Sequence, residues 1–180
     1  MLKIKNALLV LLMATVALSC NKKDDVTPDN ATISGNWKLN RVTSDSQFAN
    51  GDTEEVDDDF SNSDLYFDFE EDGTYTTNAY IELGIISEGD GTINNGTYSY
   101  ANNELSLTYY DPFADTDVTL LLDTDINNSD LKLSIGLEGL RNSVQASSGS
   151  IDGLTRAVIQ AYLSTITTFS LDLYLSITPM

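Results

Sequence analysis

Most of this chain alternates apolar and more polar residues with a period of two, which is typical of β-strands that bury one face. The alternation is most regular near the end, where Phe169, Leu171, Leu173, Leu175 and Ile177 are each separated by one residue. It predicts an antiparallel meander whose strands are mostly joined by short turns. The eight predicted strands are residues 33–43, 65–70, 74–83, 92–100, 105–109, 116–126, 131–137 and 169–177.

One segment near the C-terminus follows a different period. The apolar positions that recur there at three- and four-residue spacing are Leu154, Val158, Ala161 and Tyr162. This spacing is typical of one face of a helix, and Ser150 or Asp152 can cap its start. The pattern predicts one helix of about 15 residues between the seventh and eighth strands, after a loop over residues 139–149. Its apolar face is expected on the sheet or over one open end of a barrel.

The meander is expected to close on itself, because its first and last strands would otherwise have unpaired edges. Eight strands in this order predict an all-β fold, an antiparallel sheet that closes into a β-barrel, because closure removes exposed strand edges. The acidic residues 50–59 are expected to form a loop after the first strand, and residues 84–91 a longer connection. About 150 residues are enough for one domain with a sizeable core.

The chain begins with an apolar run, residues 7–18, which follows Lys3 and Lys5. The run is too short to span a bilayer as a helix, which takes about 20 residues, and it is typical of a secretory signal. It ends in Ala17-Leu18-Ser19-Cys20, which resembles the lipobox of bacterial lipoproteins. The resemblance implies cleavage before Cys20, a diacylglycerol on its thiol and an acyl chain on the new amino terminus.

The resemblance also divides the chain into three parts. Residues 1–19 are expected to be a signal peptide, residues 20–32 a lipidated cysteine and flexible tether, and residues 33–180 the barrel domain. The tether begins with Asn21-Lys22-Lys23-Asp24-Asp25, which resembles the export signal of surface lipoproteins in Bacteroidetes-type bacteria. A plain solvated tether is the alternative interpretation. We expect a protein anchored by lipid in the outer membrane, with exposure at the cell surface if the export signal operates.

Charge and composition exclude several classes of function. Removal of residues 1–19, which carry Lys3 and Lys5, changes the formal net charge from −19 to −21, and residues 42–131 contain no Lys or Arg. Such a surface repels nucleic acid and anionic headgroups, so we expect no nucleic-acid partner and a membrane link through lipid alone. The chain has no histidine, and its one cysteine is assigned to lipid. We therefore expect a protein that is not an enzyme and has no cofactor.

Two acidic segments resemble calcium-binding loops only in part. Residues 52–59 cluster carboxylates, which hard cations prefer, but a solvated acidic loop is the better interpretation. Asp123-x-Asp125-x-Asn127 opens like an EF-hand loop, yet Asn128 and Ser134 stand where that loop needs Gly and Glu. A hairpin turn is the better interpretation there, and no metal site is predicted.

A set of short motifs resembles the lipocalins, and in particular the lipocalin-like domains of Bacteroidetes lipoproteins. Gly35-Asn36-Trp37 resembles the G-x-W signature at the start of the lipocalin barrel. The motifs that follow it in order are Phe67-x-Phe69-x-x-Asp72-Gly73-Thr74-Tyr75, Gly96-Thr97-Tyr98-x-Tyr100 and Leu105-Ser106-Leu107-Thr108. The resemblance covers residues 33–135. In lipocalins an arginine of the last strand packs across the tryptophan; here Arg41 or Arg156 would have to take that place.

The resemblance implies a lipocalin-like β-barrel that binds a small apolar or amphipathic molecule, with Trp37 at its floor. The residues expected to line a cavity are Trp37, Phe67, Phe69, Tyr75, Tyr98, Tyr100, Leu107 and Tyr109. Eight-stranded barrels either fill with side chains or hold one small ligand. A non-catalytic protein-interaction or structural module with a filled barrel is therefore the alternative, with an unknown protein partner. Cation-dependent adhesion or carbohydrate binding through the acidic loops is a third hypothesis.

Overall fold

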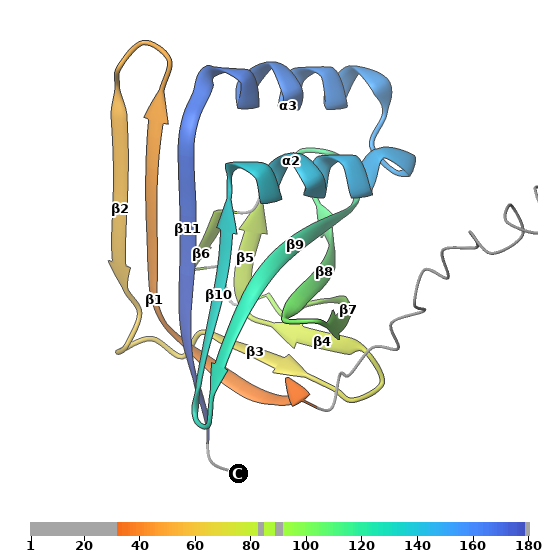
Figure 1. Cartoon of the computed structure of the whole chain (residues 1–180). Coiled ribbons are helices and arrows are strands. Elements are labelled where there is room, and N and C mark those ends of the chain that lie inside the picture. Colours follow the sequence, from red (N-terminus) through yellow and green to blue (C-terminus); the bar gives the residue numbers. More distant parts are fainter. Residues whose placement is uncertain (1–31, 83–84, 89–91, 179–180) are drawn as a thin grey trace, which may run out of the picture.

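The computed structural model describes residues 32–82, 85–88 and 92–178 (Figure 1). The predicted signal peptide, Cys20 and nearly all of the predicted tether lie outside these residues. The strands of the described part are β1 (Gly35–Phe48), β2 (Thr53–Asp59), β3 (Tyr66–Phe69), β4 (Thr74–Thr77), β5 (Ala79–Glu82), β6 (Ile85–Glu88), β7 (Asn94–Ala101), β8 (Glu104–Asp111), β9 (Thr116–Asn127), β10 (Asp130–Gly136) and β11 (Ile166–Ile177). The helices are α2 (Leu137–Ala146), a 3₁₀ turn (Ser147–Gly149) and α3 (Gly153–Thr165).

Eight of the strands close into an antiparallel barrel, which confirms the predicted all-β barrel. The sheet runs in the order β11-β10-β9-β8-β7-β4-β3-β1-β2, and β1 also pairs with β11. The closing pair is long, extending from Trp37 opposite Ile177 to Phe48 opposite Ile166. Strand β2 lies outside the closed ring, and β5 and β6 form a separate hairpin.

The acidic segment after β1 is a strand, so the predicted loop over residues 50–59 is wrong. Strand β3 pairs only with Gly35–Lys38, which leaves the rest of β1 with a free edge on that side. Strand β2 covers this edge by pairing with Arg41–Gln47. Every residue of β2 is exposed, so its carboxylates stay in water while its backbone supplies the hydrogen bonds that β1 lacks.

The predicted strand over residues 74–83 is divided at Asn78. The Asn78 side chain accepts a hydrogen bond from the backbone N–H of Tyr66 (2.9 Å) and donates one to the carbonyl of Asp64 (2.9 Å). The Asn78 side chain thus makes the hydrogen bonds that the next backbone pair between β3 and β4 would make, and the main chain leaves the barrel wall. It continues as the β5–β6 hairpin, whose Ala79 and Ile81 are buried against the core.

Two α-helices stand where one was predicted. They lie between β10 and β11, the tenth and eleventh observed strands rather than the seventh and eighth, because the sequence pattern missed β2 and the β5–β6 hairpin. Residues 139–149, predicted to be a loop, instead form most of α2 and the 3₁₀ turn.

Helix α2 and the 3₁₀ turn supply hydrogen-bond acceptors to the part of β9 that β10 leaves unpaired. Strand β10 pairs with β9 only over residues 123–127, so the first half of β9 is unpaired on that side. Ser143 Oγ accepts a hydrogen bond from the backbone N–H of Leu121 (2.9 Å), and Ser147 Oγ accepts one from that of Thr119 (2.8 Å). Each hydroxyl donates to the helix carbonyl four residues earlier, at 2.8 and 2.9 Å. Both serines are buried between helix and strand.

Helix α3 turns its predicted apolar face to solvent, which corrects the expectation that this face packs on the sheet or the barrel end. Leu154, Val158 and Tyr162 are 76%, 51% and 56% exposed, whereas Leu163 on the other side is buried. The predicted cap is present: Asp152 accepts hydrogen bonds from two backbone N–H groups of the first turn, at 2.8 and 3.2 Å. Within the described ranges, no helix has both the length and the apolar character needed to cross a membrane.

Replacing either Ser143 or Ser147 by alanine should lower the free energy of unfolding by about 1–3 kcal/mol, because a part-buried backbone N–H of β9 loses its acceptor. Urea denaturation followed by Trp37 fluorescence measures the change. Ser150→Ala, at an exposed position just after the 3₁₀ turn, is the matched control and should stay within about 0.5 kcal/mol of wild type. Equal effects at the three positions would show that the hydroxyl contacts do not stabilise the barrel.

Candidate functional site

The structure brings the eight predicted lining residues together in one buried core. They come from five strands, β1, β3, β4, β7 and β8, and none is more than 7% exposed. Phe67 and Phe69 stack with ring centroids 6.0 Å apart, and Tyr98 meets Phe69 edge-on at 4.9 Å. These separations are those of rings in direct contact. The eight side chains therefore fill the barrel by packing against one another.

Trp37 closes the end of the barrel where the chain enters. Gly35 has a φ of +132°, a conformation that L side chains rarely adopt, and this turn precedes the tryptophan. The indole N–H of Trp37 donates to the carbonyl of Ile33 at 2.8 Å, and both residues are buried. In the part of the chain that the structure describes, neither Arg41 nor Arg156 takes the place of the lipocalin arginine beside Trp37. Arg41 pairs with Asp57 at 2.7 Å on the outer surface, and Arg156 donates to the carbonyl of Ser148.

Burial in the core affects the phenols of Tyr98 and Tyr75. Tyr98 donates to the carbonyl of Glu70 at 2.7 Å, and burial, then the nearby acidic groups of residues 70–72, raise its pKa to about 12. Burial also raises the pKa of Tyr75. The ring of Tyr75 lies against Gly96, where an added Cβ would be 2.6 Å from that ring. The glycine thus leaves room for the phenol inside the wall.

A hollow of about 90 Å³ opens at the other end of the barrel, where β4 ends, β7 begins and β8 ends. We call it the tyrosine hollow. It is lined by Tyr75, Tyr80, Ile81, Asn94, Asn95, Tyr109, Tyr110 and Pro112. Only Tyr75 and Tyr109 belong to the predicted lining residues; the other predicted residues lie deeper in the core or nearer the Trp37 end. The hollow therefore offers aromatic surface bordered by phenol and amide groups.

A buried carboxylate fixes one rim of the tyrosine hollow. Asp111 is fully buried, and its Oδ1 accepts hydrogen bonds from the backbone N–H groups of Phe113 (3.0 Å) and Ala114 (2.9 Å). Its Oδ2 accepts one from the phenol of Tyr109 at 3.3 Å. The carboxylate thus holds the loop that carries Pro112 in place beside Tyr110.

Sequence reasoning missed Tyr80, Ile81, Tyr110 and Pro112 as lining residues. The alternation of β8 places Tyr110 on the outward face, so the sequence pattern predicted a surface residue there. Tyr80 and Ile81 belong to the hairpin that leaves the wall at Asn78. Tyr-Tyr-Asp-Pro at residues 109–112 was a usable signal, since an aspartate followed by proline favours a turn that carries the aromatic pair to the barrel end.

The acidic segments form no metal-binding cluster among the described residues. Residues 52–59 fall largely on β2, in water. The segment that opens like an EF-hand loop is the end of β9 and a tight turn into β10, with Asn128 at a φ of +48°, as the hairpin interpretation predicted.

Comparison with known proteins gives one match. A family model described as a lipocalin-like domain matches residues 33–133, which is more than half of the chain. No match was found among curated proteins or among solved structures. The matched span begins just before Gly35 and ends within β10, so it includes six of the eight barrel strands and the first part of β10, and it excludes both helices and β11.

The raised pKa of Tyr98 predicts a loss of stability in alkali. The unfolded chain releases this proton near pH 10, whereas the folded chain holds it to about pH 12. The stabilisation is complete below pH 10 and is lost as pH rises toward 12, so the free energy of unfolding should fall across that window. The free energy of unfolding of the Tyr98→Phe variant should fall less steeply over the same pH window, as measured by urea denaturation at a series of pH values. Tyr162→Phe controls for the number of tyrosines, and parallel curves for wild type and Tyr98→Phe would contradict the assignment.

Proposed function

The chain belongs to the lipocalin-like domain family, and we propose that it is a lipid-anchored envelope protein that binds a small, neutral, amphipathic molecule in its tyrosine hollow. The role is binding without catalysis. The observation that carries the proposal is the hollow itself, which lies at the open end of a lipocalin-like barrel and is lined by four tyrosines.

The chemistry of the hollow fits part of a ligand rather than a whole enclosed molecule. Its volume of about 90 Å³ suits a single ring or a short acyl segment, held against aromatic faces. The amides of Asn94 and Asn95 and the phenol of Tyr80 border it, so a polar end of the ligand has hydrogen-bond partners at the rim. The filled core below prevents deeper entry.

The negative charge of the chain narrows the class of ligand further. With a formal net charge of −19 and no Lys or Arg over residues 42–131, the surface around the hollow repels anions. A fatty acid or other anionic amphipath is disfavoured for this reason. A neutral amphipath meets no such barrier.

The anchor is proposed from the sequence of the N-terminal segment. Cys20 follows the apolar run of residues 7–18 within a lipobox-like motif, which supports lipid attachment at its thiol. Two or more acyl chains bind a membrane stably, since each buried methylene contributes about 0.8 kcal/mol. The charged residues after Cys20 support placement in the outer membrane, with the domain outside the cell. The tether then presents the barrel to solutes of the envelope or the medium.

N-phenyl-1-naphthylamine, a neutral fluorescent amphipath, should bind the protein with an increase in fluorescence. Tyr80→Ala should weaken this binding about tenfold, because it removes one aromatic wall of the hollow. Phe113→Ala is the matched control: Phe113 is 50% exposed on the adjacent loop but does not line the hollow, so binding should be unchanged.

Native mass spectrometry of protein from a lipid-containing lysate supplies the second readout, in which bound mass disappears on organic extraction. Bare protein together with equal probe binding by Tyr80→Ala and Phe113→Ala would contradict ligand binding at this site. The second candidate, a filled barrel that serves as an interaction module, would then be preferred. The specific observation that favours it is the exposed apolar face of α3, formed by Leu154, Val158 and Tyr162.

Replacing Cys20 by serine should abolish incorporation of an alkyne analogue of palmitate and move the protein from the membrane fraction to the soluble fraction. Expression in a Bacteroidetes-type bacterium followed by labelling and fractionation measures both. Ser19→Ala, next to the proposed cleavage site, is the matched control and should remain labelled, because small residues are tolerated there. Unchanged labelling of Cys20→Ser would refute the anchor without bearing on the tyrosine hollow.

A further inference from the structure

A second, larger hollow lies on the outer wall of the barrel, near the Trp37 end and away from the tyrosine hollow. It has a volume of about 280 Å³, and we call it the outer hollow. Its residues come from β1, β9, β10 and β11 and the turn between β9 and β10: Asn40, Asp125, Asn127, Asp130, Leu131, Lys132, Tyr174 and Leu175. Leu131 and Leu175 belong to the buried core, so the polar side chains form the accessible lining.

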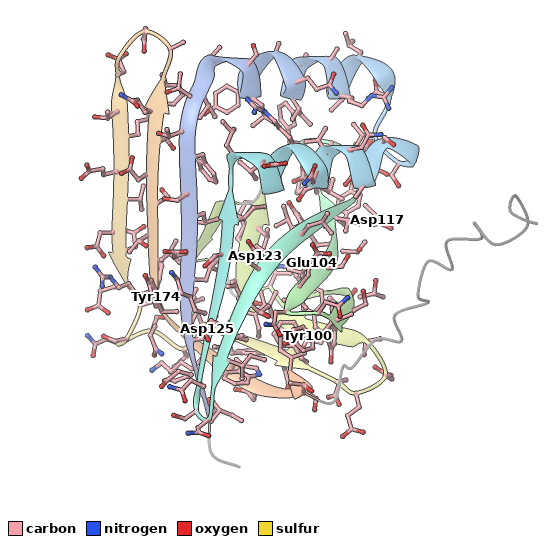
Figure 2. All side chains as sticks on the ribbon, viewed as in Figure 1. Tyr100, Glu104, Asp117, Asp123, Asp125 and Tyr174 are labelled. Carbon is pink, nitrogen blue, oxygen red and sulfur yellow. The ribbon has the colours of Figure 1, made fainter. Side chains whose placement is uncertain are left out.

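The strand register aligns these polar side chains across the wall. Lys132 lies directly opposite Asp125 on one side and Tyr174 on the other, and Asp130 lies opposite Asn127. Directly opposite residues on one face have Cβ atoms about 5 Å apart. Figure 2 shows Asp125 and Tyr174 near each other on the same wall, with Asp123 farther along β9. The groups thus converge on one small area.

A β-bulge in β1 completes the outer hollow. The register with β11 shifts between Leu39 and Arg41, both of which flank Asn40. Leu39 is buried while Asn40 and Arg41 lie on the outer side, so two consecutive residues face outward, as a bulge allows. The Asn40 amide donates to Ser176 Oγ at 2.9 Å, which holds it at the border of the hollow.

Two cations that are already paired lie near the ring of Tyr174. The Lys132 ammonium lies 5.4 Å from the ring centroid and the Arg41 guanidinium 6.0 Å. Lys132 pairs with Asp172 at 2.9 Å, and Arg41 pairs with Asp57 at 2.7 Å. The charge of each cation is therefore balanced by a carboxylate, which weakens the attraction of the outer hollow for an anionic ligand.

The remaining groups define the ligand chemistry. The two ion pairs among the described residues leave Asp125 and Asp130 without a salt-bridge partner, so both are strong acceptors for hydroxyl donors. Asn40 and Asn127 supply both donors and acceptors. Anions are repelled by a chain of charge −19, and a ligand cation would approach the ring beside Lys132 and Arg41. A neutral molecule with several hydroxyl groups fits all of these conditions.

We propose that the outer hollow binds a neutral saccharide, with one sugar ring against Tyr174 and sugar hydroxyls donating to Asp125 and Asp130. Its volume lies at the lower end of ligand sites, about 300 Å³, which suits a single sugar unit of a larger glycan. The site is independent of the tyrosine hollow, because the two share no lining residue and lie at opposite ends of the barrel.

Saturation-transfer-difference NMR of the full chain with galactose, mannose and N-acetylglucosamine tests the proposal. At least one sugar should receive saturation, with a dissociation constant in the millimolar range. Asp125→Asn and Tyr174→Ala should each weaken binding about tenfold, because one removes a charged acceptor and the other the ring. Tyr174→Phe keeps the ring and should retain binding, which separates loss of contact from loss of fold.

Asp123→Asn is the matched control. Asp123 is exposed on the same strand, two residues from Asp125, and does not line the outer hollow, so the variant should bind as wild type does. Absence of saturation transfer to all three sugars would overturn the proposal. So would binding that Asp125→Asn and Asp123→Asn weaken equally, since that result would indicate a general effect of surface charge.

Discussion

Backbone hydrogen bonding at the ends of unequal strands is the constraint on which this barrel depends. A closed ring has no edges, but β3 and β4 have four residues each while β1 and β11 have fourteen and twelve, so pairing stops before the long strands end. Each unpaired length must find partners elsewhere. Strand β2 supplies them for β1, and the hydroxyls of Ser143 in α2 and Ser147 in the 3₁₀ turn supply them for β9. The additions to the simple meander are thus consequences of strand length, and β2 in turn protects its own outer edge with carboxylates.

The packed aromatic core distinguishes this barrel from barrels that enclose a ligand in an internal cavity. Phe67, Phe69, Tyr75 and Tyr98 occupy the interior in mutual contact, and their burial stabilises a domain in which the described residues form no disulfide. The hollows consequently lie outside the packed centre, at the open end and on the wall. The binding proposed there would use a few phenol, amide and carboxylate groups at partly open surfaces. A ligand held in this way would be released readily, because less of it is removed from water.

The sequence was sufficient for the barrel because alternation is a local pattern: most of the inward positions of its strands are apolar, although Thr77 and Asp111 are buried polar exceptions. The same rule placed the eight predicted lining residues on inward strand faces, and all eight are buried in the core. It missed β2, since both faces of Thr53–Asp59 meet water and the strand exists only because β1 has a free edge. It missed α2 and the 3₁₀ turn because the residues that they place against β9 are Ser143 and Ser147, which form hydrogen bonds and follow no apolar periodicity. It also placed the apolar face of α3 inward. The outer hollow depends on the register of four strands and a bulge at Asn40, and no local pattern encodes that combination.

The pairing of β1 with β11 has a consequence for biosynthesis. The first and last strands of the domain form the closing seam, so the ring remains open until the final residues have been made. Contacts between such distant segments are slow to form, because most of the chain must be ordered as an intervening loop. A chain that is still being made therefore holds strands that cannot yet close into the barrel. The proposed export through a signal peptide would benefit from this late closure, because an incomplete barrel stays unfolded until its last strand is available.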